Sequence, residues 1–324
     1  MEDDMKGTAN RTNWKIELTK LVETHGGKAA LKNKQVSSAT KDARKKRLIT
    51  AFRTLRMLGY KIDNPRNLTE KHVKALTDKM IADGKSASLI QNVVSTLRVF
   101  SGWIGKPNMV KGLSTYAPGV KRSYAAEQDK SWEGNGIDVD AIITIISAKD
   151  NYVGMQLRAA QYFGLRRREA IMLKPIKDAR EEGLYVIHGT KGGRARMIPV
   201  ETNEQKALLK QLQTFAAGNH GRLVAPGQRI DQAIERYNYL LKCFGLTKAF
   251  MGVTGHGLRH QFAIESLARK GFTAPVRMTD GQTQKSTPEL EQSRMHVSEE
   301  LGHSRVNITN AYYGKFQAQR EVSR

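Results

Sequence analysis

The chain has little cysteine, no long apolar run and far fewer acidic than basic residues. Its single cysteine, Cys243, excludes a disulfide within the chain, as is typical of a reducing cytoplasm. Because Cys243 follows Leu240 and Leu241, we expect it in a hydrophobic core rather than as a nucleophile or metal ligand. No apolar run approaches the roughly 20 residues that cross a bilayer, and the first residues do not form a secretory signal. We therefore expect no membrane association.

Metal-ligand patterns are also missing, because histidine, cysteine and carboxylate residues do not cluster at the required spacing. We expect neither a metal nor a cofactor. What the chain has in excess is positive charge: 54 Lys and Arg against 31 Asp and Glu give a net charge of +23. An excess of this size indicates an anionic partner, and nucleic acid is the first candidate. A basic but inert surface is the alternative.

The length of 324 residues and a hydrophobic content of 39% suffice for two cores. Helices are predicted near 13–24, 38–58, 67–80 and 86–103, where apolar residues recur at intervals of three and four. Glycine, proline and polar residues then predict a linker. The predicted divisions are an N-terminal segment 1–35, which could be an arm or an oligomer contact, a helical domain 36–108, a linker 109–135 and a second domain 136–324.

The second domain alternates predicted helices with a short β-hairpin. Two strands, 184–188 and 196–200, flank a glycine-rich bend that is typical of hairpins. A stretch from 272 to 295, rich in Pro, Gly, Ser and Thr, is expected to be an inserted loop. The expected fold class is mainly α with a small β-hairpin or sheet, and the expected helices lie near 139–147, 151–163, 204–215, 229–244 and 257–270.

A run of cationic residues lies on the second predicted helix. Any one of them would suit a solvated helix face. Together with the total charge, we interpret them as contacts to DNA phosphates that position the protein without reading bases. The residues of this run are Lys41, Arg44, Lys45, Lys46 and Arg47.

Side chains suited to phosphodiester chemistry occur in order along the second domain. The sequence Gly-Leu-Arg-Arg-Arg-Glu spans 164–169, and Gly-His-Gly-Leu-Arg-His spans 255–260. Leu-Gly-His follows at 301–303, and Tyr312-Tyr313 comes last. Each residue alone would suit a structural role, since short motifs carry a false-positive risk. The ordered combination points to a nucleic-acid enzyme.

In these motifs the chain resembles the tyrosine recombinases, the family of phage and mobile-element integrases, and residues 164–313 carry the resemblance. It implies a two-domain clamp made of a helical core-binding domain and a tyrosine recombinase catalytic domain. The implied function is a site-specific recombinase that integrates or excises a mobile genetic element through a 3′-phosphotyrosyl intermediate, without metal or ATP. The implied partners are double-stranded DNA, a homo-tetramer on two DNA sites, and accessory DNA-bending or directionality proteins, in the cytoplasm at the nucleoid.

The resemblance also assigns roles to cationic residues. Arg166 and Arg259 would clamp the nonbridging oxygens of the scissile phosphate, because a guanidinium fork matches two phosphate oxygens. Lys191 in the hairpin would protonate the departing 5′ oxygen, with Arg194 as an equal choice on charge alone and otherwise a DNA contact. His256 would exchange protons near neutral pH.

His303 would bind a nonbridging oxygen, and Tyr312, nine residues later, would be the nucleophile. Tyr313 is the alternative nucleophile. Arg167 and Arg168 compete with Arg166 on charge alone, and His260 is expected to give packing support.

Two other functions are compatible with these residues. A type IB topoisomerase-like enzyme would use similar chemistry to relax supercoils as a monomer. A non-catalytic DNA-binding accessory protein would keep the positive charge without the reaction.

Overall fold

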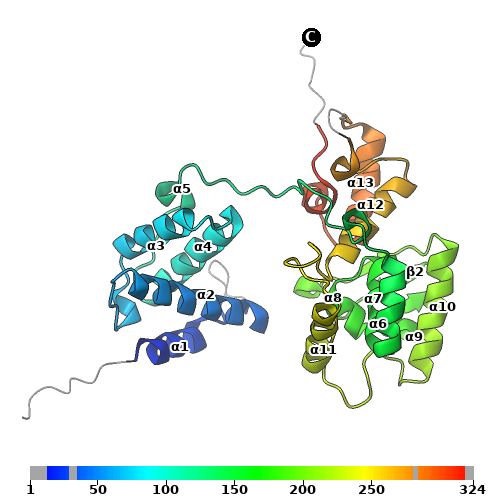
Figure 1. Cartoon of the computed structure of the whole chain (residues 1–324), viewed down its shortest axis with the longest axis horizontal. Helices are drawn as coiled ribbons and strands as arrows, with labels where there is room; N and C mark the ends of the chain where they lie inside the picture. Colours follow the sequence, from blue (N-terminus) through cyan, green and yellow to red (C-terminus); the bar gives the residue numbers. More distant parts are fainter. Residues whose placement is uncertain (1–12, 29–34, 280–283, 318–324) are drawn as a thin grey trace, which may run out of the picture. The chain divides into compact units, whose positions relative to one another are not determined.

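The computed structural model describes residues 13–28, 35–279 and 284–317, and Figure 1 shows their helices and strands. The chain divides into two compact units, residues 1–122 and 123–324. Each unit has its own hydrophobic core. The protein is mainly helical with one small sheet, so the predicted fold class is confirmed.

Helices build the core of the first unit. Polar residues start three of them, because the side chains of Asn13, Ser37 and Ser86 accept hydrogen bonds from backbone N–H groups of the first turn. Leu18 and Phe52 are buried where α1 packs on α2. The helices are α1 (Trp14–His25), α2 (Ser38–Met57), α3 (Glu70–Ala82), α4 (Ala87–Trp103) and the short α5 (Leu113–Tyr116), with a 3-10 turn at Pro65–Asn67.

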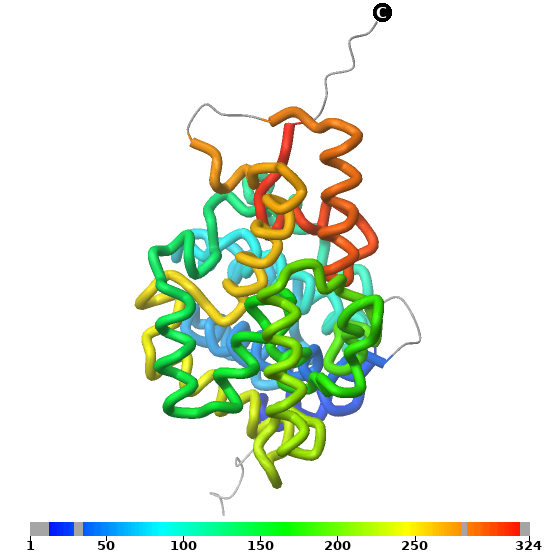
Figure 2. The backbone as a smooth tube through the Cα atoms, turned by 90° about the vertical axis from the view of Figure 1, so that its right-hand side faces the viewer, coloured from blue at the N-terminus to red at the C-terminus, as the bar shows by residue number. Residues whose placement is uncertain are grey.

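The second unit surrounds one buried helix, α7 (Asn151–Phe163), which packs against α6, α10 and α12. In Figure 2 the orange α13 runs beside the red segment that ends the described chain, and contacts between α13 and the turn at Val306–Thr309 support this. The other helices are α6 (Val139–Lys149), α8 (Arg167–Met172), α9 (Pro175–Asp178), α10 (Asn203–Ala217), α11 (Ile230–Cys243), α12 (Gly257–Arg269), α13 (Pro288–Glu300) and α14 (Asn310–Tyr313).

The sheet has three antiparallel strands in the order β1 (Ala179–Arg180), β2 (Gly183–Val186) and β3 (Arg196–Ile198). The predicted hairpin is the β2–β3 pair, in which Leu184 lies opposite Ile198. The two-residue strand β1 has no periodic signal of its own and was not expected from the sequence. The bend between β2 and β3 contains a 3-10 turn at Lys191–Gly193.

The prediction that Cys243 lies in the core is wrong, because its side chain is exposed. Helix α11 buries Ala233, Tyr237, Leu240 and Leu241, which recur at helical spacing along one face. Cys243 comes two residues after the last of these and faces away from the core.

The prediction of an inserted loop over 272–295 is wrong for its second half. Helix α13 begins at Pro288, and the Thr287 side chain accepts a hydrogen bond from the Leu290 N–H. Threonine before proline is here a helix start rather than a loop signal. Residues 280–283 lie outside the described part of the chain.

Both ends of the predicted linker 109–135 belong to the cores. Val110 and Tyr116 are buried in the first unit, and the Trp132 indole N–H donates to the Thr254 carbonyl in the second. The expected N-terminal segment 1–35 also contributes to the first core through α1, while its residues 1–12 and 29–34 lie outside the described ranges.

Candidate active site

The first part of the site is the turn from α7 into α8. Gly164 ends α7 with φ +57°, and a side chain there would collide with the Phe262 ring of α12. Arg166 then precedes α8 in an extended conformation. Its backbone N–H and one terminal nitrogen each donate to the Glu169 carboxylate, both at 2.8 Å. The turn therefore holds Arg166 half-buried and firmly oriented.

Arg259, in the first turn of α12, is fully buried and is the centre of the site. Its terminal nitrogens donate to the carbonyls of Gly164, at 2.5 Å, and Leu301. Its Nε donates to the Tyr312 hydroxyl at 3.1 Å. Burial lowers the pKa of Arg259 to about 10, which leaves the guanidinium charged at neutral pH. Arg259 thus joins three segments that are distant in the sequence.

Glu169 is buried among arginines. Burial by itself would raise the pKa of its carboxyl, but the hydrogen bonds and charge of Arg196, the charge of Arg259 and the Arg166 N–H lower that pKa to about 2. The carboxylate is therefore ionised at neutral pH and orients the cations around it.

Tyr312 contacts histidines as well as Arg259. The His303 Nε2 is 3.2 Å from the Tyr312 hydroxyl oxygen, and the His260 Nδ1 is 3.2 Å from the Tyr312 carbonyl. The ring centroid of His256 is 5.8 Å from that of Tyr312, so the predicted histidines and tyrosine come together. Arg166 reaches the same place through the Leu301 carbonyl, to which it donates at 3.4 Å.

The histidines of the site are held neutral. Desolvation, followed by the charges of Arg259 and Arg166, lowers the pKa of His303 to about 4. The pKa of His256 is also lowered, by desolvation and then by His260 and Arg259, although the side chain keeps one exposed face. Neutral imidazoles can accept or pass on protons at neutral pH.

Tyr313 faces the opposite way. Its hydroxyl oxygen is 2.5 Å from the Thr309 hydroxyl and accepts a hydrogen bond from the Arg294 Nε at 3.4 Å. The side chain is fully buried, and burial raises the pKa of the phenol. In the described residues no contact joins it to Arg259 or His303, so the geometry favours Tyr312 over Tyr313 as nucleophile.

Lys191 and Arg194, the two residues predicted from the bend of the hairpin, are exposed and make none of these contacts. Lys191 begins the 3-10 turn of the bend, and its charge contributes to the lowered pKa of His303. Arg194 follows the same turn and is also exposed. Of the arginines that compete with Arg166, Arg167 donates to the Asn238 side chain at 2.5 Å and Arg168 is exposed.

Sequence reasoning missed Arg196. The residue is buried on β3, and its terminal nitrogens donate to both Glu169 oxygens at 3.0 and 2.8 Å. Arg196 lies two residues before the apolar Ile198 on the same strand, and this spacing places both side chains on the same face, so an inward Arg196 was predictable. Nothing in the local sequence identifies the carboxylate that it meets.

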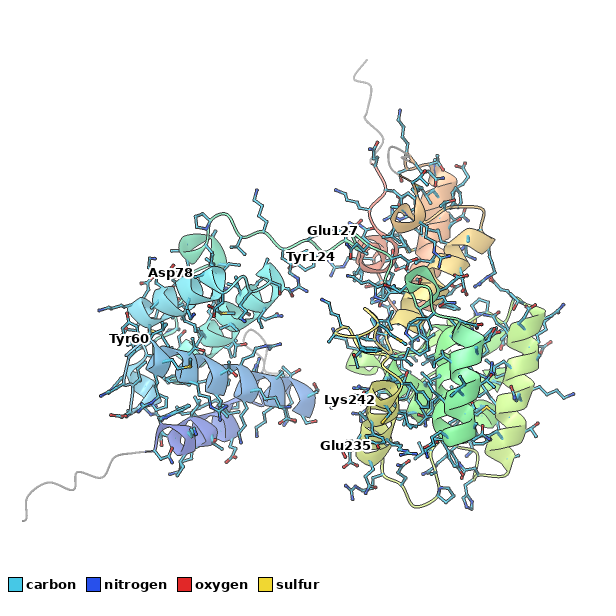
Figure 3. The ribbon with its side chains drawn as sticks, viewed as in Figure 1. Tyr60, Asp78, Tyr124, Glu127, Glu235 and Lys242 are labelled. Atoms are coloured by element: carbon cyan, nitrogen blue, oxygen red, sulfur yellow. The ribbon has the colours of Figure 1, made fainter. Side chains whose placement is uncertain are left out.

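A pocket of about 600 Å³ opens beside Arg166 and His256. Five arginines and lysines and no carboxylate are found among the described residues that line it, and one of them is Lys242 on α11, labelled in Figure 3. The positive charge of this lining favours an anionic ligand that reaches from Arg166 and His256 into the pocket.

In the first unit, one residue of the expected cationic face does not lie on the surface. Arg44 is buried, and its guanidinium donates at 2.8 Å to the carbonyls of Gly26 and Lys28. The turn after α1 leaves these carbonyls without helical partners, so the structure contradicts a surface role for Arg44. Lys41 and Lys45 approach Glu23, and Arg47 is half-buried.

Within the described ranges, no group of three or more His, Cys, Asp or Glu side chains is placed to hold a metal ion. The same ranges contain no helix that is both long and apolar enough to span a membrane.

Comparison with known proteins supports the same family as the sequence motifs. The family model described as integrase matches residues 128–265, which contain Arg166, Lys191, His256 and Arg259. Tyrosine recombinase XerA of Thermococcus kodakarensis is 26% identical over 235 residues, which are 71% of this chain and 72% of that protein. These matches support the tyrosine recombinase family for this chain.

Solved structures of tyrosine recombinases share the fold. A lambda integrase dimer bound to a COC′ core site matches with a TM-score of 0.58 at 16% identity, covering 100% of this chain and 85% of that one. The Tn1549 transposon integrase in complex with transposon right end DNA matches with a TM-score of 0.54 at 15% identity, over 94% and 95%. The XerH recombinase bound to a palindromic difH substrate matches with a TM-score of 0.52 at 18% identity, over 85% and 74%.

Proposed function

We propose that this chain is a site-specific DNA recombinase that cuts and rejoins DNA through a 3′-phosphotyrosyl bond, in the integration or excision of a mobile element. The observation that carries the proposal is the Tyr312 hydroxyl, which lies 3.1 Å from the Arg259 Nε and 3.2 Å from the His303 Nε2. A fixed cation and a neutral base thus both contact the oxygen that we propose as the nucleophile.

In the reaction, the Tyr312 oxygen attacks the scissile phosphorus and the bond from phosphorus to the 5′ oxygen breaks. Arg166 and Arg259 stabilise the negative charge that grows on the nonbridging oxygens, and preorganised charge of this kind is usually the largest catalytic contribution. The covalent intermediate conserves the energy of the phosphodiester, so attack by a 5′ hydroxyl rejoins strands without ATP.

Protons must move in both directions. We assign the phenol proton to a neutral histidine, and His303 is in hydrogen-bond range of the phenol. His256, whose ring packs near Tyr312, is a second acceptor. Lys191 would give a proton to the departing 5′ oxygen, and its position on an exposed glycine-rich bend leaves it able to reach toward bound DNA.

Double-stranded DNA is the proposed substrate and partner. In the second unit the cationic pocket beside Arg166 would bind backbone next to the scissile phosphate, and Arg194 would add a contact from the hairpin. In the first unit Lys41, Lys45 and Arg47 remain proposed phosphate contacts.

Assembly and location are proposed by analogy. A lambda integrase tetramer bound to a Holliday junction shares the fold, at a TM-score of 0.54 and 16% identity. We accordingly propose a homo-tetramer on two DNA sites, accessory DNA-bending or directionality proteins, and action at the nucleoid.

The proposal is tested with a nicked suicide substrate that carries the recombination site of the encoding element. The expected product is a protein–DNA adduct that survives SDS and forms in EDTA, because arginines rather than a metal stabilise the charge. Joining of two such sites would distinguish recombination from relaxation by a topoisomerase-like enzyme. Cognate DNA that is bound but never becomes attached would contradict the proposal and favour an accessory binding protein.

A further inference from the structure

Arg196 has no part in the chemistry above, yet it is one of the most constrained side chains of the second unit. It is 8% exposed and lies on β3, the strand that follows the bend carrying Lys191. Its Nε donates to the Glu300 carbonyl at 2.6 Å, and its two terminal nitrogens donate to the two Glu169 oxygens. The whole guanidinium edge is therefore engaged inside the protein.

These contacts connect three segments of the candidate site. Glu169 is the residue that orients Arg166, and Glu300 ends α13 just before the segment that carries His303. The last turn approaches closely: Gly302 has φ +70°, and a methyl group built on it would lie 3.0 Å from the Arg196 Cδ. Arg196 thus fixes the hairpin strand to both the first arginine and the histidine turn.

The charges around Glu169 explain why a third arginine matters. Glu169 is 2.8 Å from an Arg166 nitrogen and 3.9 Å from an Arg259 nitrogen, so its negative charge competes with a phosphate for both. One carboxylate beside three guanidiniums leaves a net charge of +2, whereas without Arg196 the net charge would be +1. A bidentate pair to Arg196 satisfies the geometry of both carboxylate oxygens.

We propose that Arg196 is a positioning residue for DNA cleavage: it neutralises Glu169, so that the charges of Arg166 and Arg259 remain available to the scissile phosphate. This inference rests on the proposed recombinase function. All three guanidinium nitrogens of Arg196 are engaged by Glu169 and Glu300, so Arg196 itself would not bind the phosphate.

The test compares a single and a double substitution at saturating DNA. Arg196→Met removes the cation and keeps the apolar stem, and we expect single-turnover adduct formation to slow by about 100-fold, as for the loss of one preorganised donor. Glu169→Gln/Arg196→Met removes both charges and restores the net charge of +2. We expect it to form adduct about tenfold faster than the single variant, since groups in one network do not act additively.

A role limited to stability would not produce this recovery, because the double variant removes more hydrogen bonds than the single one. Ile198→Ala is the matched control, because Ile198 is buried two residues further along β3, on the same face as Arg196, and carries no charge. Ile198→Ala should lower the melting temperature and leave the adduct rate of the folded protein within about threefold of the parent. The DNA affinity of all three variants should also stay within about threefold of the parent.

Wild-type cleavage by Arg196→Met, or a folded double variant no faster than the single one, would overturn the inference. If Arg196→Met does not fold, Arg196→Gln replaces it, since a glutamine removes the charge but can still donate a hydrogen bond to Glu169. That variant should be about tenfold slower than the parent, and an unchanged rate would count equally against the inference. A wild-type protein that forms no adduct would overturn the proposed function itself, which separates the two failures.

Discussion

Tyr312 and Tyr313 are neighbours in the sequence, carry the same phenol and have opposite surroundings. The Tyr312 hydroxyl meets Arg259 and His303, whereas the Tyr313 hydroxyl meets Thr309 and Arg294 beneath α13. Successive residues of a helix point about 100° apart, so one turn of α14 sends the two rings to different places. The comparison shows that chemistry here is assigned by tertiary partners and not by residue type.

The largest effect should separate the two tyrosines directly. Tyr312→Phe removes the nucleophilic oxygen and should reduce adduct formation by at least about 10⁴-fold, because nothing replaces the covalent bond. Tyr313→Phe should form adduct at a rate close to the parent, measured with the same suicide substrate. An adduct that persists in Tyr312→Phe and disappears in Tyr313→Phe would reverse the assignment.

The arginines on the Tyr312 side should show the next largest effect. Arg166→Ala and Arg259→Ala should each slow cleavage by about 10²- to 10³-fold, because each removes preorganised positive charge from the transition state. DNA affinity, measured by titration at fixed salt, should fall little because the proposed DNA contacts include many other cations. Arg229→Ala removes an exposed arginine of the same unit and should change neither quantity. Normal cleavage by either site variant would remove that arginine from the mechanism.

A pH effect on stability should come from the histidine below Tyr312. Burial, partly offset by the hydrogen bond to the Tyr312 carbonyl, lowers the pKa of His260 to about 4 from an ordinary value near 6.5. The unfolded chain then binds the proton more tightly, so the stabilisation present above pH 6.5 is lost as pH falls toward 4. Between pH 7 and pH 5 this histidine should cost about 2 kcal/mol of unfolding free energy.

Denaturant unfolding at the two pH values measures this cost. The variant His260→Gln keeps a polar side chain that does not titrate, and its unfolding free energy should depend less on pH. An identical pH dependence in parent and variant would show that His260 is not held neutral.

The smallest effect should appear on the Tyr313 side. Tyr313→Phe leaves the ring in place but deprives the buried Thr309 and Arg294 of a hydroxyl partner, which should cost about 1–2 kcal/mol. Chemical denaturation of the parent and variant measures the difference. Tyr312→Phe should also lower the unfolding free energy, because it removes the acceptor of the buried Arg259 Nε, so the adduct assay rather than unfolding separates the two phenols. A Tyr313→Phe variant as stable as the parent would contradict the structural role of Tyr313.

Strongly periodic helices were predictable from the sequence, and the bounds expected for α7, 151–163, agree with the structure. The short helix α8 was not predicted, since it is six residues long and Glu169 within it is fixed by distant arginines. The sequence predicts a loop where α13 begins, because Thr287-Pro288 has the composition of a loop.

Within the site, the order of motifs predicted which residues gather around Tyr312 but not how they are held. Arg196 and Arg44 show the limit. Both are buried because backbone carbonyls and, for Arg196, a carboxylate from elsewhere in the chain accept their hydrogen bonds. Such partners are set by tertiary structure, and local charge patterns do not reveal them.

The hydrogen bond from the Arg259 Nε to the Tyr312 hydroxyl lies within a single chain. This contact predicts that each copy cuts with its own phenol, in cis. Mixing subunits that lack Tyr312 with subunits that lack Arg259 would then create no complete site. Mixing either variant with the parent protein would give cleavage only at the positions that parent subunits occupy. In such an assembly, the conformation of each subunit would decide which strand is cut. No subunit would supply a catalytic residue to the site of its neighbour.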